Sequence, residues 1–380
     1  MKLTVKLSYL QEVMELVFRY VSKHSTLPVL ENIYIRGNID SVIFRATDME
    51  KYIDVEIPAS IEMEGAITIN AKTLYDIVKT IEEEDVVFIL DENNDTVLLR
   101  NGTDEYKIKG ISASEYVAVP EFVGNTTIKI PANQFSKGIE KVEYAVTDRN
   151  FSPVLTGVLM RLKNTTKGNK LIFVGTDSFR LSEYRVDFDG NFDPVSIIIP
   201  KLNVADIKKV SDFFVSKGGE DLEMNIADNL VSFSFKLDSF KIITTSLLIQ
   251  GNFPEYENEN IIPTVFNSKV ILNKSDLDKA IRKISILTRD INNFIDISIG
   301  ENVLSLKSGE TDRGEGKTQL SAYVEGEQIN FGINGKYVQD YIKSIEAEEM
   351  TLNVVNAERP IVFKNINDDN YTYIIRPLVK

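Results

Sequence analysis

A short stretch that returns much later in the chain constrains the fold more than any other feature of the sequence. It reads INAKTLYDIVKTI from Ile69 to Ile81, and a second copy, INGKYVQDYIKSI, runs from Ile333 to Ile345. A third version, IPKLNVADIKKV, lies between them from Ile199 to Val210, with Asp206 at the position of Asp76. Copies this far apart indicate duplicated domains, because the short units of a solenoid recur much sooner. The sequence therefore predicts three similar domains.

Each copy has the spacing of a short amphipathic helix. In the first copy the apolar residues recur at i, i+3, i+4 and i+7, which places on one face Leu74, Ile77, Val78 and Ile81. Asn70 and Asn334 stand just ahead of the apolar runs, where a side-chain oxygen can cap the first turn of a helix. The face opposite the apolar stripe carries lysines in all three copies, namely Lys72, Lys79, Lys208, Lys209, Lys336 and Lys343.

The same order of elements repeats along the chain: a strand, a helix, a strand pair, a second helix and further strands. We place the domains at residues 1–125, 126–257 and 258–380. In the third domain, Ser275-x-x-Asp278 predicts a capping box at the start of the first helix. The alternation of Leu320, Ala322 and Val324 predicts one strand. The predicted fold class is α+β, with two helices packed on antiparallel sheets in each domain.

Composition removes several classes of function. The chain has no cysteine and one histidine, His24, which excludes thiolate sites and clusters of several histidines. The first residues, MKLTVKLSYLQEVMELVFRYV, are interrupted by charges and predict neither a signal peptide nor a membrane span. We therefore expect a cytoplasmic protein without a membrane partner. The net charge of −14 allows binding to nucleic acid only where positive charge is gathered on one surface.

An enzymatic reading rests on carboxylates that recur after threonine, at Asp48, Asp177 and Asp312. Because they recur once per domain, they are more simply turn-forming residues whose oxygens accept nearby backbone N–H groups than ligands of a metal. The segment GETDRGEGKT, Gly309 to Thr318, lacks the spacing of a phosphate-binding loop and predicts an exposed hairpin connection. No catalytic residue, metal or cofactor is therefore predicted.

Five motifs occur in a fixed order across essentially the whole chain: LPVLENIYI, TDMEKYIDVEI, GTDSFRLSEYRV, GNFPEYENENIIP and YIIRPL. Together with the threefold repeat they closely resemble the DNA polymerase III beta subunit family, the sliding clamps. The resemblance implies a head-to-tail homodimeric ring with helices inside and sheets outside, which encircles double-stranded DNA irrespective of sequence and catalyses nothing. It also implies the replicative polymerase, a clamp loader and repair proteins carrying clamp-binding peptides as partners. The alternative is a three-repeat scaffold that does not encircle DNA.

The resemblance and the basic helices together give candidate site residues. For DNA contacts they are His24, Lys72, Lys79, Arg149, Lys201, Lys208, Lys279, Arg282 and Lys283. For closing the ring they are Tyr106 and Ile108 at one end and Ile286 and Leu287 at the other. For an apolar groove that takes partner peptides they are Leu155, Thr176, Arg180, Leu181, Pro254, Ile261, Tyr337, Ile374, Pro377 and Leu378.

Three features of the groove depart from the family pattern. Ser178-Phe179 replaces the usual glycine and histidine, the linker carries Glu257 and Glu259, and the tail begins with Arg376 where methionines are common. These departures bear on which peptide the groove prefers.

Overall fold

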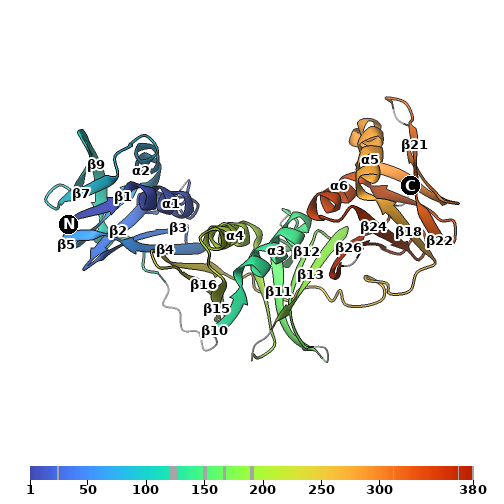
Figure 1. Ribbon diagram of the computed structural model, residues 1–380, viewed down its shortest axis with the longest axis horizontal. Helices are drawn as coiled ribbons and strands as arrows, with labels where there is room; N and C mark the ends of the chain where they lie inside the picture. Colours follow the sequence, from blue (N-terminus) through green and yellow to red (C-terminus); the bar gives the residue numbers. More distant parts are fainter. Residues whose placement is uncertain are drawn as a thin grey trace. The chain divides into compact units, whose positions relative to one another are not determined.

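The computed structural model describes residues 1–23, 25–119, 127–148, 152–165, 168–188, 192–310, 312–366 and 368–378. By its internal contacts the chain forms two compact units, drawn in Figure 1. Unit 1 consists of Met1–Ser136 and Leu202–Ile249, with a short segment that includes Phe192. Unit 2 consists of Lys137–Asp189, Asp193–Lys201 and Gln250–Lys380.

Unit 1 is built on one sheet in which all neighbouring strands are antiparallel. Its order is β10-β15-β16-β17-β4-β3-β2-β6-β9-β8-β7-β1-β5. The strands are β1 (Lys2–Lys6), β2 (Asn32–Asn38), β3 (Ser41–Thr47), β4 (Lys51–Pro58), β5 (Ser60–Met63), β6 (Gly65–Asn70), β7 (Asp85–Asp91), β8 (Thr96–Asn101), β9 (Asp104–Ser112), β10 (Thr127–Pro131), β15 (Asp221–Ile226), β16 (Leu230–Lys236) and β17 (Lys241–Leu247). The β17 and β4 strands, far apart in sequence, join the two ends of the sheet through the pairing of Thr244 with Ile53.

The helices of unit 1 bury one apolar face each. They are α1 (Leu7–Val17), α2 (Ala71–Val78), most of α4 (Lys201–Ser216) and the first turn of α3 (Ala132–Val142). The α1 and α2 helices lie side by side in Figure 1. On α1 the buried residues are Leu7, Leu10, Val13, Met14, Leu16 and Val17, and on α2 Leu74 and Val78 are buried while Ile77 is half-buried. The predicted amphipathic helix is confirmed.

Unit 2 contains two antiparallel sheets. One has the order β14-β11-β12-β13-β26-β25-β24-β18-β22 and the other β21-β20-β19-β23. Their strands are β11 (Gly157–Thr165), β12 (Gly168–Thr176), β13 (Arg180–Phe188), β14 (Val195–Pro200), β18 (Ser268–Asn273), β19 (Phe294–Gly300), β20 (Val303–Ser308), β21 (Lys317–Ser321), β22 (Tyr323–Gly326), β23 (Asn330–Asn334), β24 (Glu349–Val354), β25 (Ile361–Asn365) and β26 (Asp368–Ile375). The helices are α5 (Lys274–Thr288), α6 (Gly335–Ser344) and the rest of α3.

Two local expectations for this unit were wrong. The cap of α5 is Asn273, whose Oδ1 accepts the N–H groups of Ser275 at 2.9 Å and Asp276 at 3.3 Å, so Ser275 lies inside the helix and does not cap it. The expected strand through Leu320 and Val324 is broken at Ala322, because β21 pairs with β20 while β22 pairs with β18 in the other sheet.

Asparagine caps mark three strand-to-helix junctions. Asn70 Oδ1 accepts the N–H of Thr73 at 3.0 Å, and Asn334 Oδ1 accepts the N–H groups of Lys336 at 2.9 Å and Tyr337 at 3.4 Å. With Asn273, each is the last residue of a strand, so a single side chain ends the strand and starts the helix.

Two of the three Thr-Asp pairs form turns, as the sequence predicts. Asp48 Oδ1 accepts the N–H of Lys51 at 2.9 Å, and Asp177 Oδ1 accepts that of Arg180 at 3.0 Å. The middle residues of the two turns, Met49 and Ser178, have the same left-handed φ of 75°. Asp312 follows a residue outside the described ranges. The chain from Gly309 to Gly316 joins the antiparallel strands β20 and β21, which confirms the hairpin connection.

The part of the chain that the structure describes contains no helix long and apolar enough to cross a membrane.

Candidate functional site

A pocket of about 460 Å³ lies in unit 2 and has a largely apolar floor. The β13 and β26 strands pair through Leu181 and Ile374, and both of these buried side chains line it. A short 3₁₀ turn, Pro153–Leu155, brings the buried Leu155 to the same floor. The pocket therefore forms only where two strands nearly 200 residues apart meet, at the junction between the second and third copies of the repeat.

Arg180 is fixed in place at the edge of the pocket. Its Nη1 donates to Asp340 Oδ2 at 2.7 Å, its Nε to Asp177 Oδ2 at 3.0 Å and its Nη2 to the carbonyl of Tyr144 at 2.7 Å. The guanidinium also lies 4.4 Å from the centre of the Tyr337 ring, a cation–π distance. Burial by itself lowers the pKa of Arg180, but Tyr373, Asp340 and Asp177 outweigh it and hold that pKa above its ordinary value.

The linker that follows β17 forms the outer wall of the pocket. Tyr256 is buried and donates its hydroxyl to Glu183 Oε2 at 2.8 Å, and burial raises the pKa of this tyrosine. The carboxylate of Glu257 accepts hydrogen bonds from Arg161 at 3.2 Å and from Lys163 at 2.6 Å. The carboxylate of Glu259 accepts one from the hydroxyl of Thr264 at 2.5 Å. These two linker carboxylates, which depart from the family pattern, are therefore already hydrogen-bonded to side chains of this chain.

A cluster of four tyrosines, three of them buried and Tyr144 half-buried, lies beneath Arg180. Tyr144 and Tyr371 share a hydrogen bond of 2.7 Å between their hydroxyls, and Tyr371 also bonds Ser344 Oγ at 2.6 Å and the carbonyl of Lys141 at 3.0 Å. Tyr373 stacks on Tyr341 at 5.0 Å between ring centres. Burial raises the pKa of all four tyrosines.

This cluster was missed from the sequence. The one signal was the alternation of Tyr371 and Tyr373 in the last strand, which indicates a buried face but not its partners. The Nζ of Lys141, a buried lysine on α3, donates to the carbonyl of Ser344, and burial lowers its pKa.

Most of the predicted groove residues gather at the pocket. Its walls include Leu155, Thr176, Arg180, Leu181, Pro254, Ile261 and Ile374. The other three predicted residues do not line it. Tyr337 lies under the Arg180 guanidinium, Pro377 is buried, and the N–H of Leu378 donates to the carbonyl of Gly332 at 2.9 Å. The lining also includes Ser178, Phe179 and Arg376, which the sequence singled out only as departures from the family pattern. The lining residues that the prediction omitted are Phe253, Tyr256, Asn260, Glu358, Arg359 and Pro360.

The basic residues predicted for DNA are mostly held in ion pairs with acids nearby. Lys72 pairs with Asp76 at 2.5 Å, Arg282 with Asp278 at 2.8 Å and Lys279 with Asp276 at 3.6 Å. All of these cations are exposed, so the pairs are weak and easily exchanged. Lys283 on the same α5 helix is exposed, and no ion pair is recorded for it among the described residues.

The remaining predicted DNA contacts differ in accessibility. Lys79 lies 4.2 Å from the centre of the Tyr75 ring and 3.4 Å from Glu15. Lys201 donates to Asp148 at 2.8 Å and to the carbonyl of Val146 at 3.1 Å. Lys208 is mostly covered and pairs with Asp212 at 2.9 Å, while its neighbour Lys209 is exposed. His24 and Arg149 lie outside the described residues.

Two strand edges accompany the residues predicted to close the ring. The β9 strand pairs with β8 over residues 104–109, from Asp104 opposite Asn101 to Lys109 opposite Thr96. It pairs with β6 only through Gly110, Ile111 and Ser112. The β21 strand is the last strand of its sheet. Tyr106 is half-buried and Ile108 buried on β9, whereas on α5 Ile286 is 61% exposed and Leu287 half-buried. Both β9 and β21 thus offer backbone groups to a further strand.

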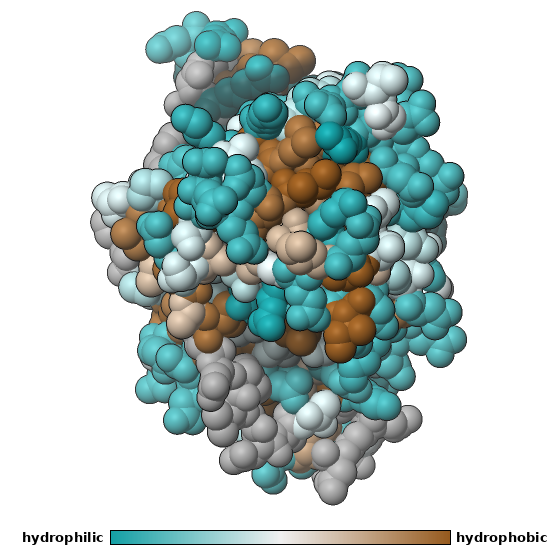
Figure 2. Space-filling model, turned by 90° about the vertical axis from the view of Figure 1, so that its left-hand side faces the viewer, coloured by the Kyte–Doolittle hydropathy of each residue, from teal (hydrophilic) through white to brown (hydrophobic). Residues whose placement is uncertain are grey.

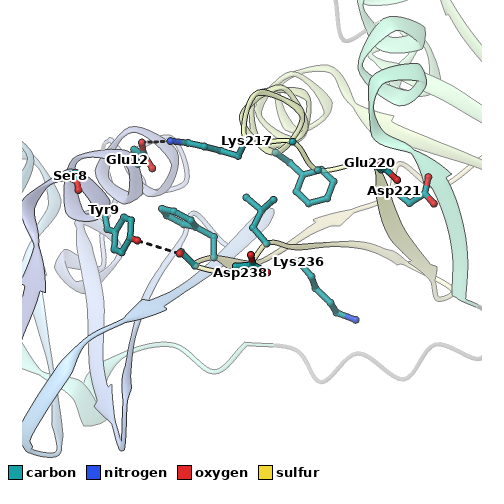
Figure 3. Close-up of a pocket in the computed structure, with 14 residues that line it drawn as sticks. Ser8, Tyr9, Glu12, Lys217, Glu220, Asp221, Lys236 and Asp238 are labelled. Carbon is teal, nitrogen blue, oxygen red and sulfur yellow. Dashed lines mark hydrogen bonds and ion pairs between the residues drawn. The ribbon is translucent and has the colours of Figure 1, made fainter.

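A larger hollow of about 820 Å³ lies in unit 1, between α1, the end of α4 and the turn after β16 (Figure 3). Across it, Glu12 pairs with Lys217 at 2.5 Å and Tyr9 donates to Ser239 Oγ at 3.3 Å. Its walls hold none of the predicted site residues. Within the described ranges, no group of three or more histidine or carboxylate side chains is placed to hold a metal ion.

Comparison with known proteins covers nearly the whole chain. Three family models match, described as the DNA polymerase III beta subunit N-terminal domain at residues 1–120, central domain at 129–255 and C-terminal domain at 259–379. A beta sliding clamp of Staphylococcus epidermidis is 26% identical over 388 residues, covering 100% of this chain and 99% of the relative.

Solved structures agree with these matches. The crystal structure of the DNA polymerase sliding clamp from Bacillus subtilis is 26% identical, with a TM-score of 0.91 over 100% of this chain and 99% of that one. A sliding clamp from Bartonella birtlesii, solved with griselimycin bound, has the same fold with a TM-score of 0.92 at 23% identity, and both chains are covered completely.

Proposed function

This chain belongs to the family of the DNA polymerase III beta subunit, the beta sliding clamp, and we propose that two copies of it close into a ring that encircles duplex DNA. It is a non-catalytic processivity subunit with three clamp domains. The observation that carries the proposal is the match of all three family domains, in order, along one chain. For the domains we propose the boundaries 1–125, 126–257 and 258–380.

Ring closure is supported by an ion pair between consecutive domains that recurs at two of three equivalent aspartates. Asp206 and Asp340 occupy equivalent places in the repeat, and each binds the basic residue that follows the preceding Thr-Asp turn, namely Lys51 and Arg180. Asp76 is the equivalent residue of the first domain, and it pairs with Lys72 of its own helix and not with a cation after a Thr-Asp turn. We infer that α2 faces the third domain of a second copy.

The strand edges support the same assembly. Residues 104–109 of β9 and the whole of β21 can pair with each other across two chains. Ile286 supplies exposed apolar surface on α5, the helix that packs against β21. Figure 2 looks onto the part of unit 1 that carries β9 and shows hydrophobic residues gathered within a hydrophilic surround. Such a patch is typical of a protein contact. A head-to-tail dimer uses each edge twice and leaves none open.

DNA contacts are proposed for the exposed helix cations Lys72, Lys79, Lys209, Lys279, Arg282 and Lys283 and for the half-buried Lys201. Lys209 takes the place of the covered Lys208, and His24 and Arg149 are family-based candidates. Exposed ion pairs along one helix contribute only about 0.3–0.5 kcal/mol, so a phosphate can replace the carboxylate at little cost. Phosphate contacts carry no sequence information, which suits a ring that must slide.

The pocket beside Arg180 is proposed to bind short peptides of the replicative polymerase, the clamp loader and repair proteins. Its apolar floor suits leucine or phenylalanine side chains, and the hydroxyl and guanidinium at its edge suit a polar neighbour. We place this activity in the cytoplasm.

The test is loading onto DNA. With its own clamp loader and ATP, the protein should be retained on nicked circular plasmid and should raise the processivity of the polymerase. Linearising the plasmid should release it, because a ring slides off an end. Salt-sensitive retention on both plasmids would indicate simple charge binding, and no retention on either would indicate a scaffold that does not encircle DNA.

A further inference from the structure

The peptide pocket contains a cation that this chain leaves unneutralised. Arg376 lines the pocket and is exposed, and no side-chain hydrogen bond or ion pair is recorded for it within the described residues. Arg180 differs, since Asp340 and Asp177 already neutralise it. An exposed arginine without a carboxylate of this chain, in a largely apolar pocket, is available to the carboxylate of a ligand.

The backbone fixes where Arg376 points. Its N–H donates to the carbonyl of Phe179 at 2.8 Å, one step beyond the pairs Arg180–Ile375 and Leu181–Ile374. Directly opposite residues in an antiparallel pair lie on the same face, and alternate residues share that face. Phe179 and Arg376 therefore stand beside Leu181 and Ile374, on the side that forms the floor.

Of the acids around the pocket, only Glu358 is left to compete for Arg376. Glu257 binds Arg161 and Lys163, Glu259 binds Thr264, and Glu183 binds Tyr256 and Arg185. Glu358 lines the pocket without a recorded ion pair, but a second arginine, Arg359, lines it too and donates to Asn260 Oδ1 at 2.5 Å. The two arginines against one glutamate leave the rim with a net positive charge.

We propose that Arg376 is a specificity-determining residue that makes this groove select peptides with an aspartate or glutamate beside their leucine or phenylalanine residues. The apolar residues of the peptide fill the floor at Leu181 and Ile374, and the carboxylate binds the Arg376 guanidinium next to the Phe179 ring. This inference rests on the proposed peptide-binding function of the pocket and adds the chemistry of its partner.

The experiment measures peptide affinity by fluorescence anisotropy on the full-length protein. The probe is a labelled peptide Ser-Leu-Ser-Leu-Phe-Ser with both ends capped, in which each serine in turn is replaced by aspartate or by asparagine. At one position at least, aspartate should bind about tenfold more tightly than asparagine at low salt, the size expected for a charge-assisted hydrogen bond. This preference should shrink as salt is added.

Protein variants separate the charge from packing. Arg376→Met keeps the length and apolar stem of the side chain and should abolish the preference for aspartate while leaving the asparagine peptides unaffected. Arg376→Lys should restore part of the preference, and Glu358→Gln should increase it. Lys307→Met, an equal loss of charge on the exposed face of β20, is the matched control and should change nothing.

The results distinguish two failures. If the peptides bind but aspartate is never preferred, or the preference survives in Arg376→Met, the proposed specificity role of Arg376 is wrong. The proposed peptide-binding function of the pocket is then still supported. If no peptide binds at any concentration, the proposed peptide-binding function fails and this inference fails with it.

Discussion

Arg180 Nη1 lies 2.7 Å from Asp340 Oδ2, although 160 residues separate them in the chain. The same contact occurs earlier, where Lys51 Nζ lies 2.5 Å from Asp206 Oδ2. In both cases the cation follows a Thr-Asp turn and the carboxylate sits on the second helix of the next repeat. One ion pair thus recurs wherever one copy of the repeat follows another.

We expect Asp340→Asn and Asp206→Asn each to destabilise the protein. Each removes the nearer of two carboxylates from a largely buried cation, leaving Asp177 with Arg180 and Asp48 with Lys51, and a weakened buried ion pair of this kind costs about 1–3 kcal/mol. Both variants should therefore lower the melting temperature by several degrees in a calorimetric scan. The matched control is Glu62→Gln, which removes the exposed pair with Lys2 and should leave the melting temperature nearly unchanged. Equal losses of melting temperature at all three positions would contradict the expected difference between largely buried and exposed ion pairs.

The double variant Ile286→Lys with Leu287→Lys should give a folded monomer. Two lysines at the proposed contact would place charge in an apolar interface, while the buried face of α5, which includes Ile281 and Ile284, stays intact. Light scattering at low micromolar concentration measures the mass, and circular dichroism checks the fold. Ile39→Lys, in the 84% exposed turn after β2, is the control and should remain a dimer. A dimer mass for the double variant would overturn the assignment.

Removing the exposed cations of α5 should weaken DNA binding. For Lys279→Ala with Arg282→Ala and Lys283→Ala, the slope of log affinity against log salt on a labelled duplex should fall by about 0.9 for each phosphate that the variant no longer neutralises. The control replaces the strand residues Lys236, Lys241 and Lys269 by alanine, which removes as much charge from the sheets. If both triple variants change the slope equally, the α5 cations have no particular role.

Acidification should loosen the linker wall of the peptide pocket. Burial alone raises the pKa of Glu257, but Lys163, Arg161 and Arg185 outweigh it and hold that pKa below its ordinary value of 4.5. Because the pKa is lower in the folded state, the stabilisation is present above pH 4.5 and is lost as the pH falls through the folded pKa. The protection factors of residues 250–262, each taken relative to the intrinsic exchange rate at the same pH, should therefore fall below pH 4.5. In Glu257→Gln these protection factors should already be low at pH 7 and should change little on acidification.

Asn273→Ala should cost about 1 kcal/mol of stability, the usual loss for a helix cap. Ser275→Ala should be nearly neutral, since Ser275 only donates its backbone N–H to Asn273. Urea unfolding of the two variants compares them directly. A larger loss at Ser275 would restore the capping box that the sequence suggested.

The local part of this protein could be predicted because it depends on neighbours in sequence. Apolar residues at i, i+3, i+4 and i+7 identified the helix after Asn70, and the turns at Asp48 and Asp177 follow from oxygens that reach N–H groups two and three residues on. The capping box failed for a related reason. Asn273 and Ser275 are both good caps, and only the end of β18 decides between them.

The sequence by itself determined the threefold repeat, its helices and its turns, and through them the family. The tertiary structure decided which equivalent residues do different work. Asp76, Asp206 and Asp340 align in sequence, yet two of them bind a preceding repeat and one binds its own helix. Arg376 enters the pocket only because β26 pairs with β13 in one register. Such contacts depend on how distant strands meet, which periodicity along a single segment does not specify.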